Sequence, residues 1–165
     1  MVVEMLEELL KAGFPKETAL EMMNTALVMG REEVFFSTVD MSVFDLYTGN
    51  CEFIKAGAAQ TFIRHDGNME HIYSESLPLG VVKSTAAAAV KRKLSSGDMV
   101  VMVTDGVLDA LPHGEEEKLL DMIIGGTPLE NPKELAHYIL EKVLELGNTE
   151  PLDDMTVLVA GIWQM

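Results

Sequence analysis

The sequence predicts an α+β fold in which helices pack outside one or more largely antiparallel sheets. Two segments with helical periodicity open the chain, and hairpin-linked apolar segments follow them. Two more helical segments then precede a last apolar strand. Hairpins, rather than strands that alternate singly with helices, are typical of antiparallel sheets.

The chain opens with two predicted helices. Residues 2–12 carry apolar side chains at helical spacing, and Gly13 ends this segment. Pro15 suits the first turn of a second helix over 16–29, which Gly30 terminates. Each segment has one apolar face, so both are expected to pack on the core.

The apolar period then changes to two, which predicts strands. "LYTGN" reads as a turn, and Asp66-Gly67 between two strand-like runs is a strong hairpin signal. The run from 99 to 104 is continuously apolar and predicts a buried strand. The strands are expected at residues 39–44, 51–58, on either side of Asp66-Gly67, at 87–94 and at 99–104.

Helices return after this strand. A short acidic helix is expected over 115–124. Asn131-Pro132 is a typical start for a longer amphipathic helix, and Gly147 ends it. The run "MTVLVAGIW" closes the chain as a last strand.

Composition narrows the possible functions. The 165 residues suffice for one domain, and the net charge of −15 argues against a nucleic-acid partner. The single cysteine, Cys51, excludes an internal disulfide and suits a reducing, cytoplasmic location. No apolar run reaches the roughly 18 residues of a membrane span, and the acidic start does not resemble a signal peptide.

Carboxylates stand at the ends of two apolar strands. Asp105, followed by Gly106, comes after the strand at 99–104, and Asp153 and Asp154 precede the last strand. If these strands are antiparallel neighbours, the carboxylates meet at one rim, where they could bind Mg²⁺ or Mn²⁺. Alternatively they are ordinary turn residues, and Gly106 permits a tight turn.

Other candidate sites have less support. Ser37 and Thr38 lie on a strand with no evident base to activate a nucleophile. Gly57 indicates either a bulge or a backbone that approaches a ligand. The histidines lack the spacing of metal ligands: His65, His71, His113 and His137.

Four stretches carry a family resemblance: "FFSTVDMSVFDLYTGNCEFIKAGAAQTFIR", "SLPLG", "LSSGDMVVMVTDGVLDAL" and "DDMTVLVAGI". With them the chain resembles the bacterial PPM-type (type 2C) metal-dependent serine/threonine phosphatases over nearly its whole length. The "TDG" and "DDMT" elements are common to that wider family. The "DLYTG" and "KAGAA" stretches resemble its sporulation subgroup, the C-terminal phosphatase domains of the stage II sporulation protein E family.

The resemblance implies a four-layer αββα sandwich, with two antiparallel sheets flanked by helices and two Mn²⁺ or Mg²⁺ ions at one edge. Asp105 and Asp153 match metal-binding aspartates of the family. Asp154, which stands where many relatives have Asn, and Gly106 would support these ligands without binding metal. The ions would generate a hydroxide that attacks the phosphoryl group.

One family motif has no counterpart in the sequence: an Asp-Gly on an early strand that supplies a carboxylate bridging both ions. Residues 1–165 are therefore expected to form a single, N-terminally truncated phosphatase domain that lacks its first strands. Such a chain should be inactive by itself. Its uncovered strand edges should favour a dimer or larger homo-oligomer.

Two functions follow as hypotheses. The first is a phosphatase that removes phosphate from a serine of an anti-anti-sigma factor and so activates a sporulation sigma factor. The alternative is a non-enzymatic regulatory or protein-interaction module on the same scaffold. Either would be cytoplasmic, with any membrane attachment of a full-length parent outside this chain.

Overall fold

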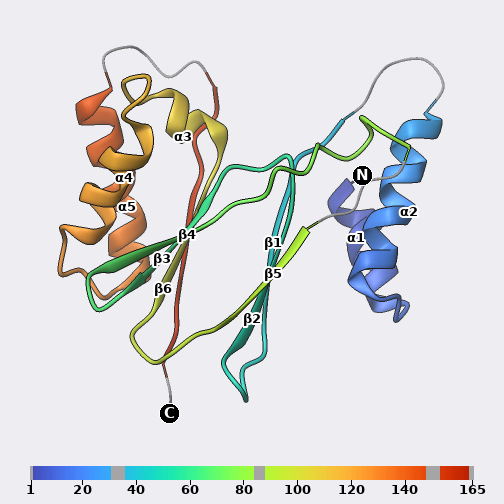
Figure 1. Cartoon of the computed structure of the whole chain (residues 1–165), viewed down its shortest axis with the longest axis horizontal. Helices are drawn as coiled ribbons and strands as arrows, with labels where there is room; N and C mark the ends of the chain where they lie inside the picture. The colour runs from blue at the N-terminus through green and yellow to red at the C-terminus, as the bar shows by residue number, and fades with distance from the viewer. Residues whose placement is uncertain (1, 31–35, 84–87, 148–152, 164–165) are drawn as a thin grey trace. The chain divides into compact units, whose positions relative to one another are not determined.

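The computed structural model describes residues 2–30, 36–83, 88–147 and 153–163 (Figure 1). The chain divides into two compact units, which are described separately. The first unit comprises Met1–Val43, Glu52–Ala58 and Ser74–Lys91, and the second comprises Phe44–Cys51, Ala59–Tyr73 and Arg92–Met165. None of the helices in the described ranges has the length and apolar character needed to cross a bilayer.

Two helices open the first unit, where the sequence predicts them. α1 (Val2–Lys11) packs against α2 (Lys16–Met29), and Gly30 follows α2 as its C-cap. Apolar side chains of α2 join residues from later in the chain to form the core of this unit. Its buried members are Leu20, Met23, Ile54, Ala56 and Leu79.

A buried asparagine anchors α2 to a distant segment. The Nδ2 of Asn24 donates to the carbonyl oxygen of Val82 at 3.0 Å, and its Oδ1 accepts from the amide of Gly80 at 2.8 Å. These bonds satisfy a side chain that would be costly to bury alone. They fix the "SLPLG" stretch against the helix.

The smaller sheet has three strands in the order β1-β2-β5. They are β1 (Val39–Phe44), β2 (Asn50–Ala56) and β5 (Ala88–Lys93). Lys55 on β2 is buried, and its ammonium lies 2.6 Å from Oδ2 of Asp40 on β1. Burial lowers the pKa of Lys55, and the hydrogen bond to Asp40 opposes this shift.

Gly57 follows β2 in a left-handed conformation, with φ of +62°. A Cβ at this position would lie 2.4 Å from Cγ of Pro78. Glycine is therefore needed here because another segment of the same chain passes close to it. The sequence suggested a bulge or the approach of a ligand, whereas the structure shows the approach of Pro78 from the same chain; contact with a ligand stays a prediction.

Over the described residues, the larger sheet has four antiparallel strands in the order β4-β3-β6-β7. They are β3 (Thr61–His65), β4 (Asn68–Ile72), β6 (Met99–Val103) and β7 (Val157–Gly161). Asp66 and Gly67 join β3 to β4 with positive φ values of 47° and 79°. This confirms the predicted hairpin, since a two-residue turn of this kind favours Asp-Gly.

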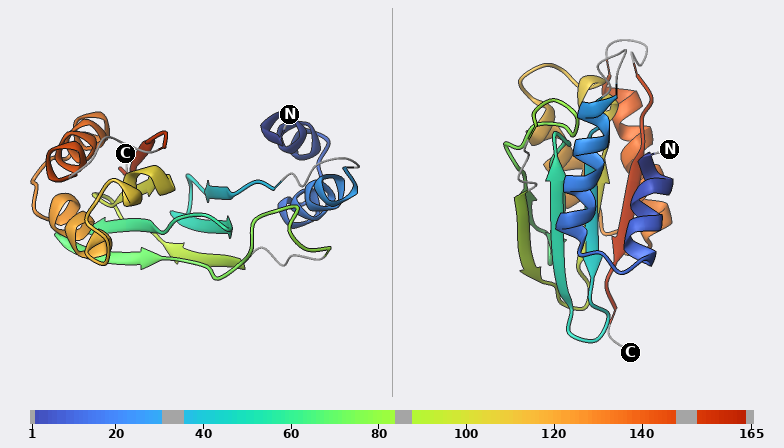
Figure 2. Two further views of the ribbon diagram at one scale, coloured as in Figure 1. Left: turned by 90° about the horizontal axis from the view of Figure 1, so that it is seen from above. Right: turned by 90° about the vertical axis from the view of Figure 1, so that its right-hand side faces the viewer.

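The described part of the second unit contains three helices: α3 (Asp105–Asp109), α4 (Glu116–Gly125) and α5 (Pro132–Leu146). α4 and α5 lie side by side (Figure 2), and their apolar faces share a core with β3 and β6. Asn131 caps α5 as predicted, because its side chain accepts from the amides of Lys133 and Glu134. α3 was not predicted, since its five residues are too few to show helical periodicity.

A buried arginine holds the loop between α4 and α5. Arg64 on β3 donates from Nη1 to the carbonyl oxygens of Ile124 and Thr127, at 3.0 and 2.9 Å, and from Nη2 to that of Leu129. Burial lowers the pKa of its guanidinium. The arginine thus supplies donors to Ile124 in the last turn of α4 and to two carbonyls of the loop that follows it.

Candidate functional site

The acidic residues singled out in the sequence come together at one end of β6 and β7. These strands are antiparallel neighbours, with Val103 paired to Val157. The C-terminal end of β6 therefore lies beside the N-terminal end of β7. Asp105 lies two residues after the end of β6, and Asp153 lies four residues before the start of β7, so the expected shared rim is present.

Thr104 ties the two chain segments together at this rim. Its amide donates to the carbonyl oxygen of Thr156 at 3.1 Å, and its Oγ1 accepts from the amide of Thr156 at 2.9 Å. The same hydroxyl donates to the carbonyl oxygen of Asp154 at 3.2 Å. These bonds continue the pairing of β6 with β7 beyond Val103 and Val157, the last paired residues at this end of the two strands. Thr104 was not among the predicted site residues, although it directly precedes Asp105.

The expectation that Gly106 forms a tight turn is wrong. Gly106 is buried in the first turn of α3, and it is not among the glycines with positive φ. A Cβ on Gly106 would lie 2.5 Å from the carbonyl oxygen of Asp154 and 3.2 Å from that of Asp153. The residue must therefore be glycine because the backbone of the opposite segment occupies the space of a side chain.

We expect Gly106→Ala to destabilise the protein by about 2 kcal/mol, because a methyl group in this space forces the 153–154 backbone away. Urea unfolding measures the change. Gly125→Ala is the matched control: its Cβ would meet nothing closer than Cγ of Met69 at 3.5 Å, so stability should be unchanged or slightly higher. Equal stability of the two variants would contradict the close approach at Gly106.

The side chains at the rim have the chemistry of a hard-cation site. Asp105 and Asp153 are exposed, and Oδ1 of Asp153 accepts from the amide of Asp154 at 2.7 Å. In the described residues, the carboxylate of Asp105 has no hydrogen-bond or ion-pair partner. Carboxylate oxygens suit Mg²⁺ and Mn²⁺. However, nowhere in the described ranges do three or more His, Cys, Asp or Glu side chains gather as a metal-binding group.

Three of the four histidines have partners outside this rim, and the fourth is exposed. The imidazole of His65 is hydrogen-bonded to the buried carboxylate of Asp98, which raises the pKa of His65. His71 lies 2.8 Å from Oδ1 of Asp121. His113 pairs with Glu116 at 3.1 Å, and His137 is exposed on α5.

Ser37 does not belong to a catalytic arrangement in the described residues. It forms an isolated bridge with Leu79, and its hydroxyl donates to the carbonyl oxygen of Thr38 at 3.3 Å. Both contacts involve backbone groups of Leu79 and Thr38, so Ser37 stabilises the local backbone conformation.

Comparison with known proteins identifies relatives over the whole chain. The model of the family described as Stage II sporulation protein E (SpoIIE) matches residues 1–163. Stage II sporulation protein E of Bacillus subtilis (strain 168) is 28% identical over 161 residues, which are 97% of this chain and 20% of that protein. The chain thus spans about a fifth of the length of that relative.

Solved structures show the same fold. The PP2C phosphatase domain of SpoIIE from Bacillus subtilis, solved with a fragment of its regulatory domain, has a TM-score of 0.88 at 27% identity. That match covers 98% of this chain and 49% of the solved chain. The phosphatase domain presoaked with Mn has a TM-score of 0.73 at 27% identity, over 99% of this chain and 72% of the solved chain. The predicted α+β class with two antiparallel sheets and helices is confirmed.

Proposed function

Because the chain belongs to the stage II sporulation protein E family, we propose that it acts in a metal-dependent PP2C-type phosphatase domain that hydrolyses phosphoserine or phosphothreonine in proteins. The observation that carries this proposal is the rim at β6 and β7, where Asp105 and Asp153 meet on a fold shared with PP2C domains. Metal dependence is supported by the Mn-presoaked relative.

In this proposal Asp105 and Asp153 hold Mn²⁺ or Mg²⁺. When bound, such ions acidify a water and offset charge on the phosphoryl oxygens. The chain's own residues would position the two carboxylates that bind the ions. Gly106 lets the backbone of Asp154 approach α3, and Thr104 bonds both segments, so the two carboxylates are held at the ends of rigid strands.

We further propose that these two carboxylates are only part of the coordination needed for two ions, and that residues 1–165 alone turn over substrate negligibly. The scarcity of carboxylate groups at the rim supports this proposal, since no cluster of three or more potential ligands occurs in the described residues. The same observation favours a second candidate, a regulatory or interaction module that has no catalysis of its own.

Titration of the chain with Mn²⁺ tests this assignment of ligands. Electron paramagnetic resonance of free Mn²⁺ should give a dissociation constant that is millimolar or weaker, because few carboxylates contribute. Asp105→Asn and Asp153→Asn should each weaken binding further. Asp109→Asn, which removes the same charge at an exposed position of α3, should not. Tight binding of two ions per chain would show that the site is complete.

The substrate we propose is a phosphorylated anti-anti-sigma factor, whose dephosphorylation would activate a sporulation sigma factor in the cytoplasm. Membership of the sporulation family supports this choice. Phosphate release from the purified phosphoprotein by the full-length gene product tests it. Release from unrelated phosphoproteins at the same rate would count against it.

We also propose that the chain forms a dimer or larger homo-oligomer through edge strands or the N-terminal helices. In support, β7 is an outer strand of its sheet, and Leu158 on it is exposed. Light scattering at physiological salt should detect a species larger than the 18.1 kDa chain. A monomer across a wide concentration range would contradict this proposal.

A further inference from the structure

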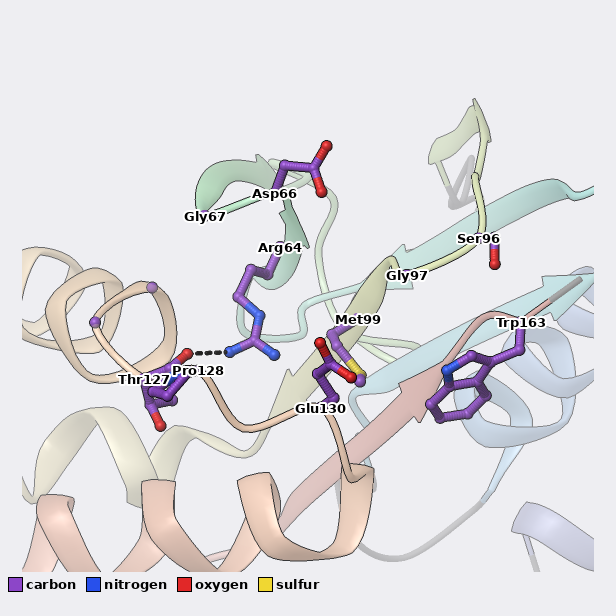
Figure 3. Close-up of a pocket in the computed structure, with 12 residues that line it drawn as sticks. Arg64, Asp66, Gly67, Ser96, Gly97, Met99, Thr127, Pro128, Glu130 and Trp163 are labelled. Atoms are coloured by element: carbon purple, nitrogen blue, oxygen red, sulfur yellow. Dashed lines mark hydrogen bonds between the residues drawn. The ribbon is translucent and has the colours of Figure 1, made fainter.

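The end of β6 and β7 opposite to Asp105 and Asp153 carries two adjoining hollows in the second unit. Met99 pairs with Gly161 at this end. The first hollow, of about 630 Å³, is lined by Arg64, Glu130 and the loop after α4 (Figure 3). The second, of about 710 Å³, is lined by the turn between β1 and β2. Ser96 and Trp163 line both hollows, so the two form one continuous surface.

Trp163 is the only tryptophan of the chain, and it is 57% exposed. Its ring lies over Gly161, where a Cβ would come within 2.2 Å of Cη2 of the indole. The glycine thus leaves room for the indole to rest on the backbone of β7. One face of a large aromatic ring is held in place while the remainder stays open to solvent.

The turn between β1 and β2 presents two more apolar side chains. Leu46 is 90% exposed and Tyr47 is fully exposed. The turn is rigid, because Oδ1 of Asp45 accepts from the amides of Tyr47 and Thr48, at 2.9 and 3.1 Å. These bonds lower the pKa of Asp45.

A glycine fixes the base of the same turn. Gly49 has φ of +72°, and a Cβ there would lie 2.8 Å from the carbonyl oxygen of Leu94. The carbonyl oxygen of Gly49 also accepts from the amide of Leu94 at 2.8 Å. The backbone that carries Leu46 and Tyr47 is therefore fixed before any partner arrives.

The charge around the hollows is negative. Three acidic residues line them, namely Asp45, Asp66 and Glu130. Among the described residues of the two linings, Arg64 is the only basic one, and its guanidinium donates inward to backbone carbonyls. With a net charge of −15 on the chain, this surface attracts cationic groups.

We propose that Leu46, Tyr47 and Trp163, together with Asp66 and Glu130, form a docking surface for a protein segment that presents an apolar side chain beside lysine or arginine. Tyrosine and tryptophan are the residue types that dominate binding energy at interfaces. A surface held rigid before binding loses less entropy when a partner docks, and the acidic residues select a basic partner.

Two other occupants match this surface less well. Self-association through this surface would bring Asp66 and Glu130 of two copies close together, so like charges would repel; the homo-oligomer proposed above uses edge strands or the N-terminal helices instead. Anionic lipid bilayers would repel the acidic residues that line the hollows, because both carry negative charge. A protein segment with an apolar side chain beside lysine or arginine can pack on the exposed aromatic rings and also pair with the acidic residues.

A random dodecapeptide phage library, selected on the full chain and counter-selected on Tyr47→Ser, tests the proposal. Recovered peptides should combine an aromatic or aliphatic residue with lysine or arginine. A synthetic peptide of the commonest recovered sequence should shift the emission of Trp163 to shorter wavelength, because docking removes the indole from water. Fluorescence anisotropy of the labelled peptide then gives its dissociation constant.

Three variants and one control complete the test. Tyr47→Ser, Gly161→Ala and Glu130→Gln should each raise the dissociation constant by about tenfold or more, a change typical of residues central to an interface. Gly161→Ala displaces the indole without removing it, and circular dichroism checks that the variant folds. Glu117→Gln removes an exposed charge on α4 and should leave the dissociation constant unchanged.

Several results would overturn the proposal. They are no enrichment over the Tyr47→Ser chain, recovered peptides without basic residues, or equal peptide binding by Tyr47→Ser. Blue-shifted emission with vesicles of phosphatidylcholine and phosphatidylglycerol would assign the surface to membranes instead. A blue shift that depends on protein concentration alone would assign it to self-association.

Discussion

The proposed function predicts that Asp105→Asn in the full-length gene product lowers Mn²⁺-dependent phosphatase activity by at least about a hundredfold. Asparagine keeps the size of the side chain but removes the negative charge that attracts the cation. The fold should survive, because Asp105 is exposed and its carboxylate bonds to no other described residue. Release of phosphate from a phosphoserine peptide, measured across a range of Mn²⁺ concentrations, gives the effect.

Asp109→Asn is the control for this change, since it removes the same charge from the exposed side of the same short helix. It should retain the activity of the unchanged protein. Near-normal activity of Asp105→Asn at every Mn²⁺ concentration would show that Asp105 does not bind a metal. Equal losses in both variants would point to damage to α3 instead.

Arg64→Met should destabilise the protein more than Gly106→Ala does. Methionine fills much of the arginine's volume but donates no hydrogen bond, so the carbonyls of Ile124, Thr127 and Leu129 lose their partner. An unsatisfied buried acceptor costs about 1–3 kcal/mol. Since the loop can relax toward water, we expect a total loss of about 3 kcal/mol in urea unfolding.

Arg92→Met is the matched control. Arg92 pairs with Glu70, and both side chains are more than a third exposed. An exposed ion pair contributes less than about 1 kcal/mol, so this variant should unfold near the midpoint of the unchanged protein. Equal destabilisation by the two substitutions would mean that Arg64 does not anchor the loop.

The sequence predicted those parts of the fold that depend on local pattern. Asp66-Gly67 indicated the hairpin because few other residue pairs adopt its two positive φ angles. Asn131-Pro132 indicated the start of α5, since both residues suit a helix N-terminus. The shared rim of Asp105 and Asp153 followed from two apolar strands that carry acids at their ends.

Features that depend on tertiary contact were not predictable in this way. Gly106 looks like a turn residue in the sequence, yet it is required because the carbonyl of Asp154 lies against it. Arg64 resembles a surface charge on a strand, but its partners lie 60 or more positions away. The hollow beside Trp163 combines segments that are distant in sequence.

Paramagnetic relaxation by Mn²⁺, observed in the amide spectrum of the chain, tests whether the ends of β6 and β7 bind a cation. At low Mn²⁺, the amides of Gly106, Val107, Asp154 and Thr156 should broaden first, and Asp105→Asn should abolish this preference. Broadening that centres on the exposed acidic residues at the start of α4, or that spreads evenly over all acidic residues, would contradict cation binding at these ends.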